Sequence, residues 1–210
     1  MVVPSPPFTP GPPISGPEMQ PSAKDALRKA ALEARKALVR TLSDADRILL
    51  ERRLAEHLTS LCADCSVVGG YAPIGSEISP LLATEEARSV GAIVAFPAFD
   101  HPAKAFRFRA GDPLEPGPFG MMQPKLRAPV VEPDLVLVPL LAIDGEGTRL
   151  GRGKGHYDRA LSRLKTSGAR LVGVGWPLQR LTSTIPADEW DVPLHAFASP
   201  DGVEWFNGSP

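Results

Sequence analysis

The sequence has little cysteine, almost no net charge and no long apolar run. Its 210 residues include two cysteines and carry a formal net charge of -1 at pH 7. A balanced charge gives no general attraction to nucleic acid or anionic lipid, so any anion must be bound by a local cluster of cations. No window approaches the roughly 20 apolar residues that span a bilayer, and no signal peptide opens the chain. These absences predict a cytoplasmic protein without nucleic-acid or membrane partners.

The two cysteines, Cys62 and Cys65, lie close together in a setting that does not suit redox chemistry. A redox C-x-x-C pair lies at the start of a helix, where the helix dipole lowers a thiol pKa, whereas this pair follows a helical pattern and precedes a strand. A zinc site needs two further ligands, and His57 is the only nearby candidate. We therefore expect neither redox chemistry nor a metal at this pair.

The two commonest nucleotide-binding motifs are absent as well. A Walker loop needs a glycine at position 148 and a serine or threonine at position 155, where the chain has Thr148 and Gly155. The dinucleotide pattern G-x-G-x-x-G begins at Gly151 but ends on His156 instead of a glycine. A nucleotide site in this chain must therefore be of another kind.

What the chain does have, over 148–158, is a run of glycines alternating with long cations that leads into a helical pattern. Glycine lets the backbone adopt positive φ and turn several N–H groups toward an anion. Arg149, Arg152 and Lys154 can neutralise the anion, and the following helix adds its positive N-terminal dipole. This glycine-cation run favours a phosphate site, although a solvated turn whose charges keep the chain soluble shows the same pattern.

Hydrophobic periodicity predicts strands that alternate with helices. Ser22 with Asp25, and Ser43 with Asp46, have the spacing of helix N-caps. Strands are expected over 66–72, 93–96, 106–109, 134–140 and 171–175, and further helices over 81–90 and 157–165. This alternation predicts a three-layer α/β fold, with a mainly parallel sheet, helices on both faces and a short antiparallel edge at 106–109.

A single domain over 23–210 is expected to hold the core, because 43% of the residues are hydrophobic. The preceding segment, 1–22, contains eight of the 24 prolines and almost no charge. That composition predicts an extended or disordered tail without catalytic residues.

Three unusual loops are expected beyond the carboxyl ends of the strands, where parallel sheets bind their ligands. They are the loop with Glu77, the segment that follows Phe96 and Pro97, and the glycine-cation run. Glu77, near Tyr71 and Ile74, can orient a nitrogen-rich ring by accepting its N–H groups, or it can be an exposed loop carboxylate.

Two aspartates are candidates for metal binding. Asp158, one turn into the helix after the glycine-cation run, can hold Mg²⁺ against phosphate oxygens or can simply complement the helix dipole. Asp191 lies in an acidic run near the end of the chain, and its spacing alone favours a surface charge.

The segment 149–158, together with 138–144 before it, resembles the central motif of the 5-formyltetrahydrofolate cyclo-ligases, also called methenyltetrahydrofolate synthetases. Further matching positions are Lys24 and Arg28 in the first helix, the segment 71–77, Phe96 and Pro97, Gln179 and Asp191. The motif is long and specific, and the resemblance covers about residues 23 to 200.

The resemblance implies a monomeric enzyme of folate and one-carbon metabolism that uses ATP and Mg²⁺. It would close the imidazoline ring of 5-formyltetrahydrofolate to give 5,10-methenyltetrahydrofolate, ADP and phosphate. Charge builds on the transferred phosphoryl group, so such a site needs cations, Mg²⁺ and backbone donors more than a nucleophilic side chain.

The matching positions assign roles to individual residues. Arg152 and Lys154 would stabilise the phosphoryl group, and Asp158 and Asp191 would bind Mg²⁺. The residues implied for ATP are Lys24, Arg28, Arg149, Leu150, Gly151, Arg152, Gly153, Lys154, Gly155, His156 and Tyr157. Those implied for the folate are Tyr71, Ile74, Glu77, Arg152 and His156.

Three positions depart from the pattern of the family. His156 stands where a tyrosine is usual, Trp190 where a histidine or asparagine is common, and His195 where an aspartate is frequent. The last two changes weaken the expected metal site near Asp191, and His156 can make the activity pH-sensitive because histidine titrates near neutrality.

Two other classes of function stay open. One is a different phosphate-handling α/β enzyme, such as a sugar-phosphate isomerase or a kinase, and the other is a non-catalytic nucleotide-binding paralogue. An unrelated phosphate binder has no need of both Lys24 and Glu77, so their presence favours the ligase.

Overall fold

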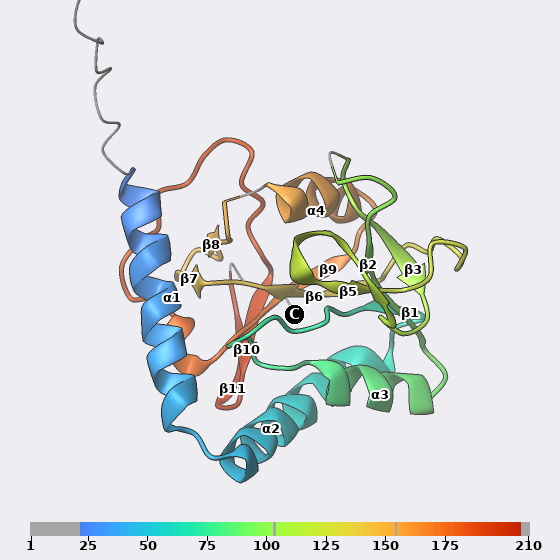
Figure 1. Cartoon of the computed structure of the whole chain (residues 1–210), viewed down its shortest axis with the longest axis horizontal. Coiled ribbons are helices and arrows are strands. Elements are labelled where there is room, and N and C mark those ends of the chain that lie inside the picture. The colour runs from blue at the N-terminus through green and yellow to red at the C-terminus, as the bar shows by residue number, and fades with distance from the viewer. Residues whose placement is uncertain (1–21, 103, 154, 207–210) are drawn as a thin grey trace, which may run out of the picture.

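A seven-stranded sheet forms the centre of the protein in a computed structural model that describes residues 22–102, 104–153 and 155–206 (Figure 1). In chain order its strands are β1 (Val67–Gly69), β2 (Ile93–Ala98), β3 (Arg107–Ala110), β6 (Leu135–Pro139), β9 (Arg170–Val174), β10 (Ala196–Ser199) and β11 (Gly202–Trp205). Their order in the sheet is β11-β10-β9-β6-β1-β2-β3. The chain thus builds outward from β1 in one direction and from β6 in the other, which makes the β1/β6 boundary a topological switch point.

The strands from β10 to β2 are parallel to one another, as predicted, and β3 is the predicted antiparallel edge. A second antiparallel edge, formed by β11 against β10, was not predicted. The strand expected over 66–72 is shorter, because only Val67–Gly69 pairs with β2, and only Val68 and Gly69 of it pair with β6 as well.

Helices cover both faces of the sheet (Figure 1). The helices α2 (Asp44–Ala63) and α3 (Leu81–Ser89) pack on one face, and α4 (His156–Thr166) packs on the other. Alternate side chains of β6 pack on opposite faces of the sheet: Leu135 and Leu137 are buried with α2, and Val136 and Val138 are buried with α4. This alternation confirms the three-layer fold, because both faces of a central parallel strand must be covered.

The first helix, α1 (Ala23–Thr41), stands at the side of the molecule rather than on a face of the sheet (Figure 1). The hydroxyl of Ser22 accepts the N–H of Asp25, so the predicted cap is present. Leu27 and Ala31 pack against a small cluster that includes Leu150 and Ile185. The helix is thereby fixed to the segment that carries the glycine-cation run.

A small hairpin follows β6, and its second strand lies at the start of the glycine-cation run, where a loop was expected. It pairs β7 (Ala142–Ile143) with β8 (Arg149–Leu150) in antiparallel fashion. The buried carboxylate of Asp144 accepts the N–H groups of Glu146 and Thr148 and so closes the turn. A second short hairpin, of β4 (Glu115–Pro116) and β5 (Met122–Gln123), encloses the 3-10 turn η1 (Pro118–Gly120), and another such turn is η2 (Pro177–Gln179).

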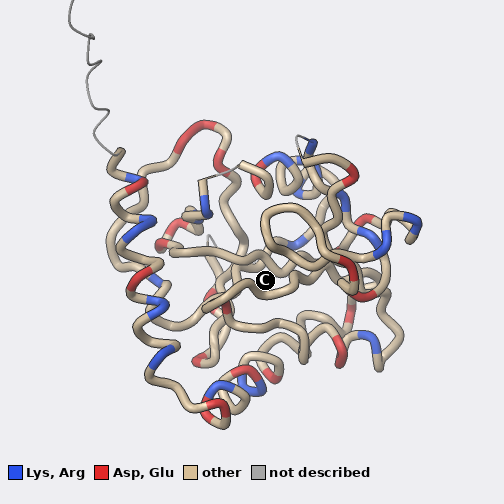
Figure 2. The backbone as a smooth tube through the Cα atoms, in the orientation of Figure 1, with Lys and Arg blue, Asp and Glu red and all other residues tan. Residues whose placement is uncertain are grey.

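Several other expectations can be compared with the structure. Of the predicted tail, 1–22, only Ser22 lies within the described residues, and it belongs to α1 as its cap. Cys62 and Cys65 are buried, and burial raises the pKa of the Cys62 thiol to about 12, so this thiol stays protonated at physiological pH. Acidic and basic positions are interspersed along the backbone (Figure 2). Within the described ranges, no helix has the length and apolarity needed to cross a bilayer.

Candidate active site

A cavity of about 190 Å³ lies beside the β1/β6 switch point. Its wall includes residues from all three predicted loops: 71–77, the segment around Phe99, and the glycine-cation run. Pro139 and Leu140, at the end of β6, complete the base. The loops therefore meet where a parallel sheet is expected to bind its ligand.

The glycines of the run are needed for its path. Gly153 and Gly155 have φ values of +82° and +63°, which glycine adopts without strain. A side chain at Gly151 would meet the guanidinium of Arg149 at 2.7 Å. Gly155 also caps α4, so the positive end of that helix and its first N–H groups border the cavity.

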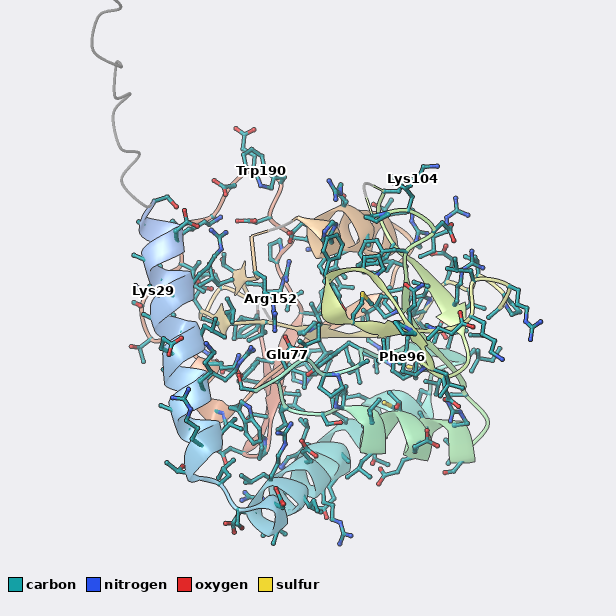
Figure 3. The ribbon with its side chains drawn as sticks, in the orientation of Figure 1. Lys29, Glu77, Phe96, Lys104, Arg152 and Trp190 are labelled. Carbon is teal, nitrogen blue, oxygen red and sulfur yellow. The ribbon has the colours of Figure 1, made fainter. Side chains whose placement is uncertain are left out.

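Two of the predicted cations are paired with carboxylates that were themselves predicted for the site. An Nη of Arg149 donates to Asp158 at 2.5 Å, and an Nη of Arg152 donates to Glu77 at 2.9 Å. Arg152 and Glu77 come from distant parts of the chain and lie together in the middle of the molecule (Figure 3). The alternative that the run is a plain solvated turn does not account for these contacts.

Glu77 is a buried residue of the cavity wall. It is 7% exposed, so the alternative of an exposed loop carboxylate is wrong. Its Oε2 accepts the N–H of Ile74 at 2.9 Å, while Oε1 faces Arg152. A carboxylate held in this way can accept the N–H groups of a ring that enters the cavity.

Tyr71 and Tyr157 contribute their rings to the cavity wall. The hydroxyl of Tyr71 donates to the carbonyl of Ile78 at 2.7 Å, and the guanidinium of Arg149 lies 5.7 Å from the ring centre of Tyr157. Burial raises the pKa of both phenols, so both stay neutral and act as apolar surfaces at physiological pH.

An aromatic wall made by Phe99, Phe119 and His156 faces these tyrosines and was only partly predicted. The imidazole centre lies 4.6 Å from the Phe119 ring and 5.1 Å from the Phe99 ring. Phe99 falls in one of the predicted loops, but Phe119 was missed. The signal was its turn, Gly-Pro-Phe-Gly, in which Phe119 itself adopts a φ of 63°.

The helix α1 reaches the site through the two residues that the resemblance singled out. The Nε of Arg28 donates to the carbonyl of Gly151 at 3.2 Å. The Nζ of Lys24 lies 2.6 Å from carboxylate oxygens of both Asp188 and Asp191. A merely solvated helix face makes no such contacts, and Asp188 is a further residue of this cluster that the sequence did not reveal.

The remaining predicted residues are placed less directly. Lys154 lies outside the described residues. Leu150 is buried in the small cluster under α1 and does not border the cavity. Trp190 is 69% exposed at the periphery (Figure 3). His195 lies at the sheet, where its Nδ1 accepts the N–H of Leu171, so its departure from the family pattern does not alter the cavity.

The two aspartates predicted for Mg²⁺ border one cavity of about 750 Å³ that adjoins the first at Gly155. Asp158 is paired with Arg149 and Asp191 with Lys24. In the described part of the chain, no cluster of three or more His, Cys, Asp or Glu side chains forms a metal cage. Magnesium is commonly held by one or two carboxylates together with phosphate oxygens and water, so the pair suits Mg²⁺ that arrives with a nucleotide.

The protein-family model for the 5-formyltetrahydrofolate cyclo-ligase family matches residues 20–200. The chain belongs to this family. A cyclo-ligase from Mycolicibacterium smegmatis is 30% identical over 193 residues, which cover 87% of this chain and 96% of the relative. The one from Haemophilus influenzae is 34% identical over 105 residues, so that alignment spans only 48% of this chain and 56% of the relative.

Solved structures from the family have the same fold. The 5,10-methenyltetrahydrofolate synthetase of Aquifex aeolicus superposes with a TM-score of 0.73 at 29% identity, covering 89% of this chain and 94% of that one. The synthetase of Mycoplasma pneumoniae gives 0.67 at 23% identity, with 85% and 99% covered, and supports the fold alone. The cyclo-ligase motif therefore lies on the cyclo-ligase fold. The predicted residues that line its first cavity are Tyr71, Ile74, Glu77, Arg149, Gly151, Arg152, Gly153, Gly155, His156, Tyr157 and Asp158.

Proposed function

We propose that the protein catalyses the ATP- and Mg²⁺-dependent cyclisation of 5-formyltetrahydrofolate to 5,10-methenyltetrahydrofolate, with release of ADP and phosphate. The contact between Glu77 and Arg152 carries this proposal. It joins the residue expected to hold the ring of the folate to the residue expected to hold the transferred phosphoryl group. The two substrates would therefore meet at this contact.

The proposed chemistry has two steps. The formyl oxygen first attacks the γ-phosphorus of ATP, so an O–P bond forms and ADP leaves. The N10 nitrogen of the folate then attacks the activated formyl carbon, N10 loses its proton, and the C–O bond breaks to release phosphate. Activation is needed because the oxygen of an N-formyl group is a poor leaving group by itself.

The chain supplies charge stabilisation for both steps. Arg152 and Lys154 would neutralise the phosphoryl group, and the N–H groups at the start of α4 would donate to its oxygens. Lys24 and Arg28 would bind the nucleotide from the side of α1. Mg²⁺, when bound, neutralises phosphate charge, and Asp158 and Asp191 are the residues that would hold it.

The folate would be bound by the opposite part of the cavity. Glu77 would accept N–H groups of the pterin ring, with Tyr71 and Ile74 beside it. His156 would contribute to the aromatic surface against which the ring packs. The residues that would bind the folate all line the same cavity, and the enzyme would act as a monomer.

The test is the appearance of the methenyl chromophore when the protein is mixed with 5-formyltetrahydrofolate, ATP and Mg²⁺. Omission of ATP or Mg²⁺ should abolish the signal. Arg152→Met should lower turnover by about 10² or more, because one stabiliser of the transition state is lost.

Arg163→Met is a matched control for that variant. Arg163 is 48% exposed and pairs with Glu132, and neither of them lines the cavity, whereas Arg152 is 49% exposed and pairs with Glu77. The control should keep its activity. Folded protein that binds ATP and gives no chromophore would instead be a non-catalytic nucleotide-binding paralogue.

A further inference from the structure

Arg35 is a buried cation behind the cavity that neither the motif nor the proposed reaction uses. It lies on α1 and is 1% exposed. Its Nε donates to the hydroxyl of Ser76 at 3.0 Å and its Nη1 to the carbonyl of Leu140 at 3.1 Å. These contacts fix the guanidinium between the loop that carries Glu77 and the end of β6.

The third nitrogen of Arg35 has no hydrogen-bond partner among the described residues. Nη2 is buried and lies 3.9 Å from Oε1 of Glu77, beyond hydrogen-bond distance. A buried donor without a partner costs about 1–3 kcal/mol, so such a group calls for an explanation. Its direction toward a residue of the active site suggests that the partner is acquired during function.

The oxygen that Nη2 faces is already occupied by another guanidinium. Oε1 of Glu77 accepts from Arg152 at 2.9 Å, and Oε2 accepts from the backbone of Ile74. Arg35 and Arg152 therefore approach the same oxygen, and only Arg152 is within hydrogen-bond distance of it. Only Arg152 is free to leave, since its side chain is 49% exposed while that of Arg35 is 1% exposed.

We propose that Arg35 is a positioning residue that takes over Oε1 of Glu77 when Arg152 turns to the phosphoryl group. This inference rests on the proposed function, in which Arg152 must serve the phosphoryl group. Without a second cation, the departure of Arg152 would leave a buried carboxylate without a compensating charge. With Arg35 in place, the carboxylate of Glu77 keeps a cation beside it and keeps accepting the N–H groups of the ring.

The other groups around Glu77 cannot replace Arg35. Tyr71 and Tyr157 face it from the β1 loop and from α4, and both phenols are neutral because burial raises their pKa. Arg47, from α2, donates to the backbone carbonyl of Glu77 instead of to its carboxylate. Burial lowers the pKa of Arg35, but a guanidinium keeps its proton at physiological pH.

The first test needs neither an Arg35 variant nor a folate. A crystal structure of Arg152→Met should show Nη2 of Arg35 moved from 3.9 Å to about 3 Å from Oε1 of Glu77. A gap that stays open, or a Glu77 side chain turned away from Arg35, would overturn the proposal. Because this test involves no substrate, its outcome does not depend on the proposed function.

The second test measures the affinity for 5-formyltetrahydrofolate. With Arg35→Met, binding should weaken by about tenfold, because the buried carboxylate of Glu77 loses a cation beside it. Arg35→Lys changes the hydrogen-bonding geometry but keeps the charge, so it should restore most of the affinity. Equal losses for the Met and Lys variants would overturn the proposal.

Arg170→Met is the matched control. Arg170 also donates to a backbone carbonyl, the partly buried one of Leu61, and it does not line the cavity. The variant should lower stability without altering the affinity for the folate. If the unaltered protein binds no 5-formyltetrahydrofolate at all, the proposed function fails, while the structure of Arg152→Met still decides the role of Arg35.

Discussion

Asp144→Asn is expected to destabilise the protein by loosening the hairpin that carries the glycine-cation run. The carboxylate of Asp144 is 1% exposed. Its Oδ1 accepts the N–H groups of Glu146 and Thr148 at 3.0 and 2.9 Å, and its Oδ2 accepts that of Ile185 at 2.8 Å. One side chain thus joins the start of the run to the segment that leads to Asp191.

The size of the effect follows from these three hydrogen bonds. The side-chain carbonyl oxygen of asparagine can still accept the N–H groups of Glu146 and Thr148. Its NH2 group, however, would face the N–H of Ile185, so that two donors oppose each other. One buried donor is orphaned and two charge-assisted bonds become neutral, which together cost about 2–3 kcal/mol. For a chain of this length, that loss lowers the unfolding temperature by about 5–10 °C.

Two measurements check this expectation. Thermal or urea unfolding gives the change in stability, and titration with a non-hydrolysable ATP analogue gives the change in affinity. Affinity for the analogue should fall by about tenfold, because the two segments that Asp144 joins are no longer held in a fixed position relative to each other.

Asp134→Asn is the matched control for this variant. The Oδ2 of Asp134 also accepts two backbone N–H groups, those of Ser66 and Val67, both at 2.8 Å, but at the opposite end of the sheet. It should lower stability and leave the affinity for nucleotide unchanged. An Asp144→Asn protein as stable as the unaltered one, to within about 0.5 kcal/mol, would refute the reasoning.

Three further outcomes are expected. Lys154→Ala should lower turnover by about 10² or more, and a near-normal rate would remove Lys154 from the catalytic set. The rate of the unaltered enzyme should change between pH 6 and pH 8, and the His156→Tyr variant should show a flatter pH profile. A flat pH profile in the unaltered enzyme would count against a role for His156. Burial tends to raise the pKa of Asp191, but hydrogen bonds from the Asp188 N–H and from Lys24 lower this pKa overall. These hydrogen bonds therefore stabilise the fold above the ordinary pKa of 3.8, and their contribution is lost as the pH falls below that value. Lys24→Met should therefore lower the unfolding temperature at pH 7 and make little difference at pH 3, and an equal loss at both pH values would contradict this account.

Local patterns were sufficient to predict most of the elements. Ser22 and Ser43 cap their helices as expected, because a capping pattern involves residues only three positions apart. The parallel middle of the sheet followed from the alternation of strands and helices. The β10/β11 edge and the β7/β8 hairpin were missed, since their strands are short and pair through contacts that periodicity does not encode.

The candidate site was predicted in its composition but not in its pairings. Motif and spacing singled out Glu77, Arg152 and Asp158, and all three border the cavity. Arg35 gave no signal, because one arginine in an amphipathic helix looks like any other solvated charge. Phe119 was missed for a related reason, since its place depends on how the β4/β5 hairpin folds over the cavity.

The sequence by itself determined which chemistry is available: glycines that permit positive φ, cations beside them, and carboxylates in separate loops. Only the tertiary structure decided which charged groups form pairs. The fold of the sheet brings Arg152 to Glu77, and the packing of α1 brings Lys24 to Asp191. Burial was decided at the same level: Glu77 is a buried carboxylate, and Nη2 of the buried Arg35 makes no hydrogen bond within the described part of the chain. Electrostatic partners depend on distance in space, which a local pattern along the chain does not specify.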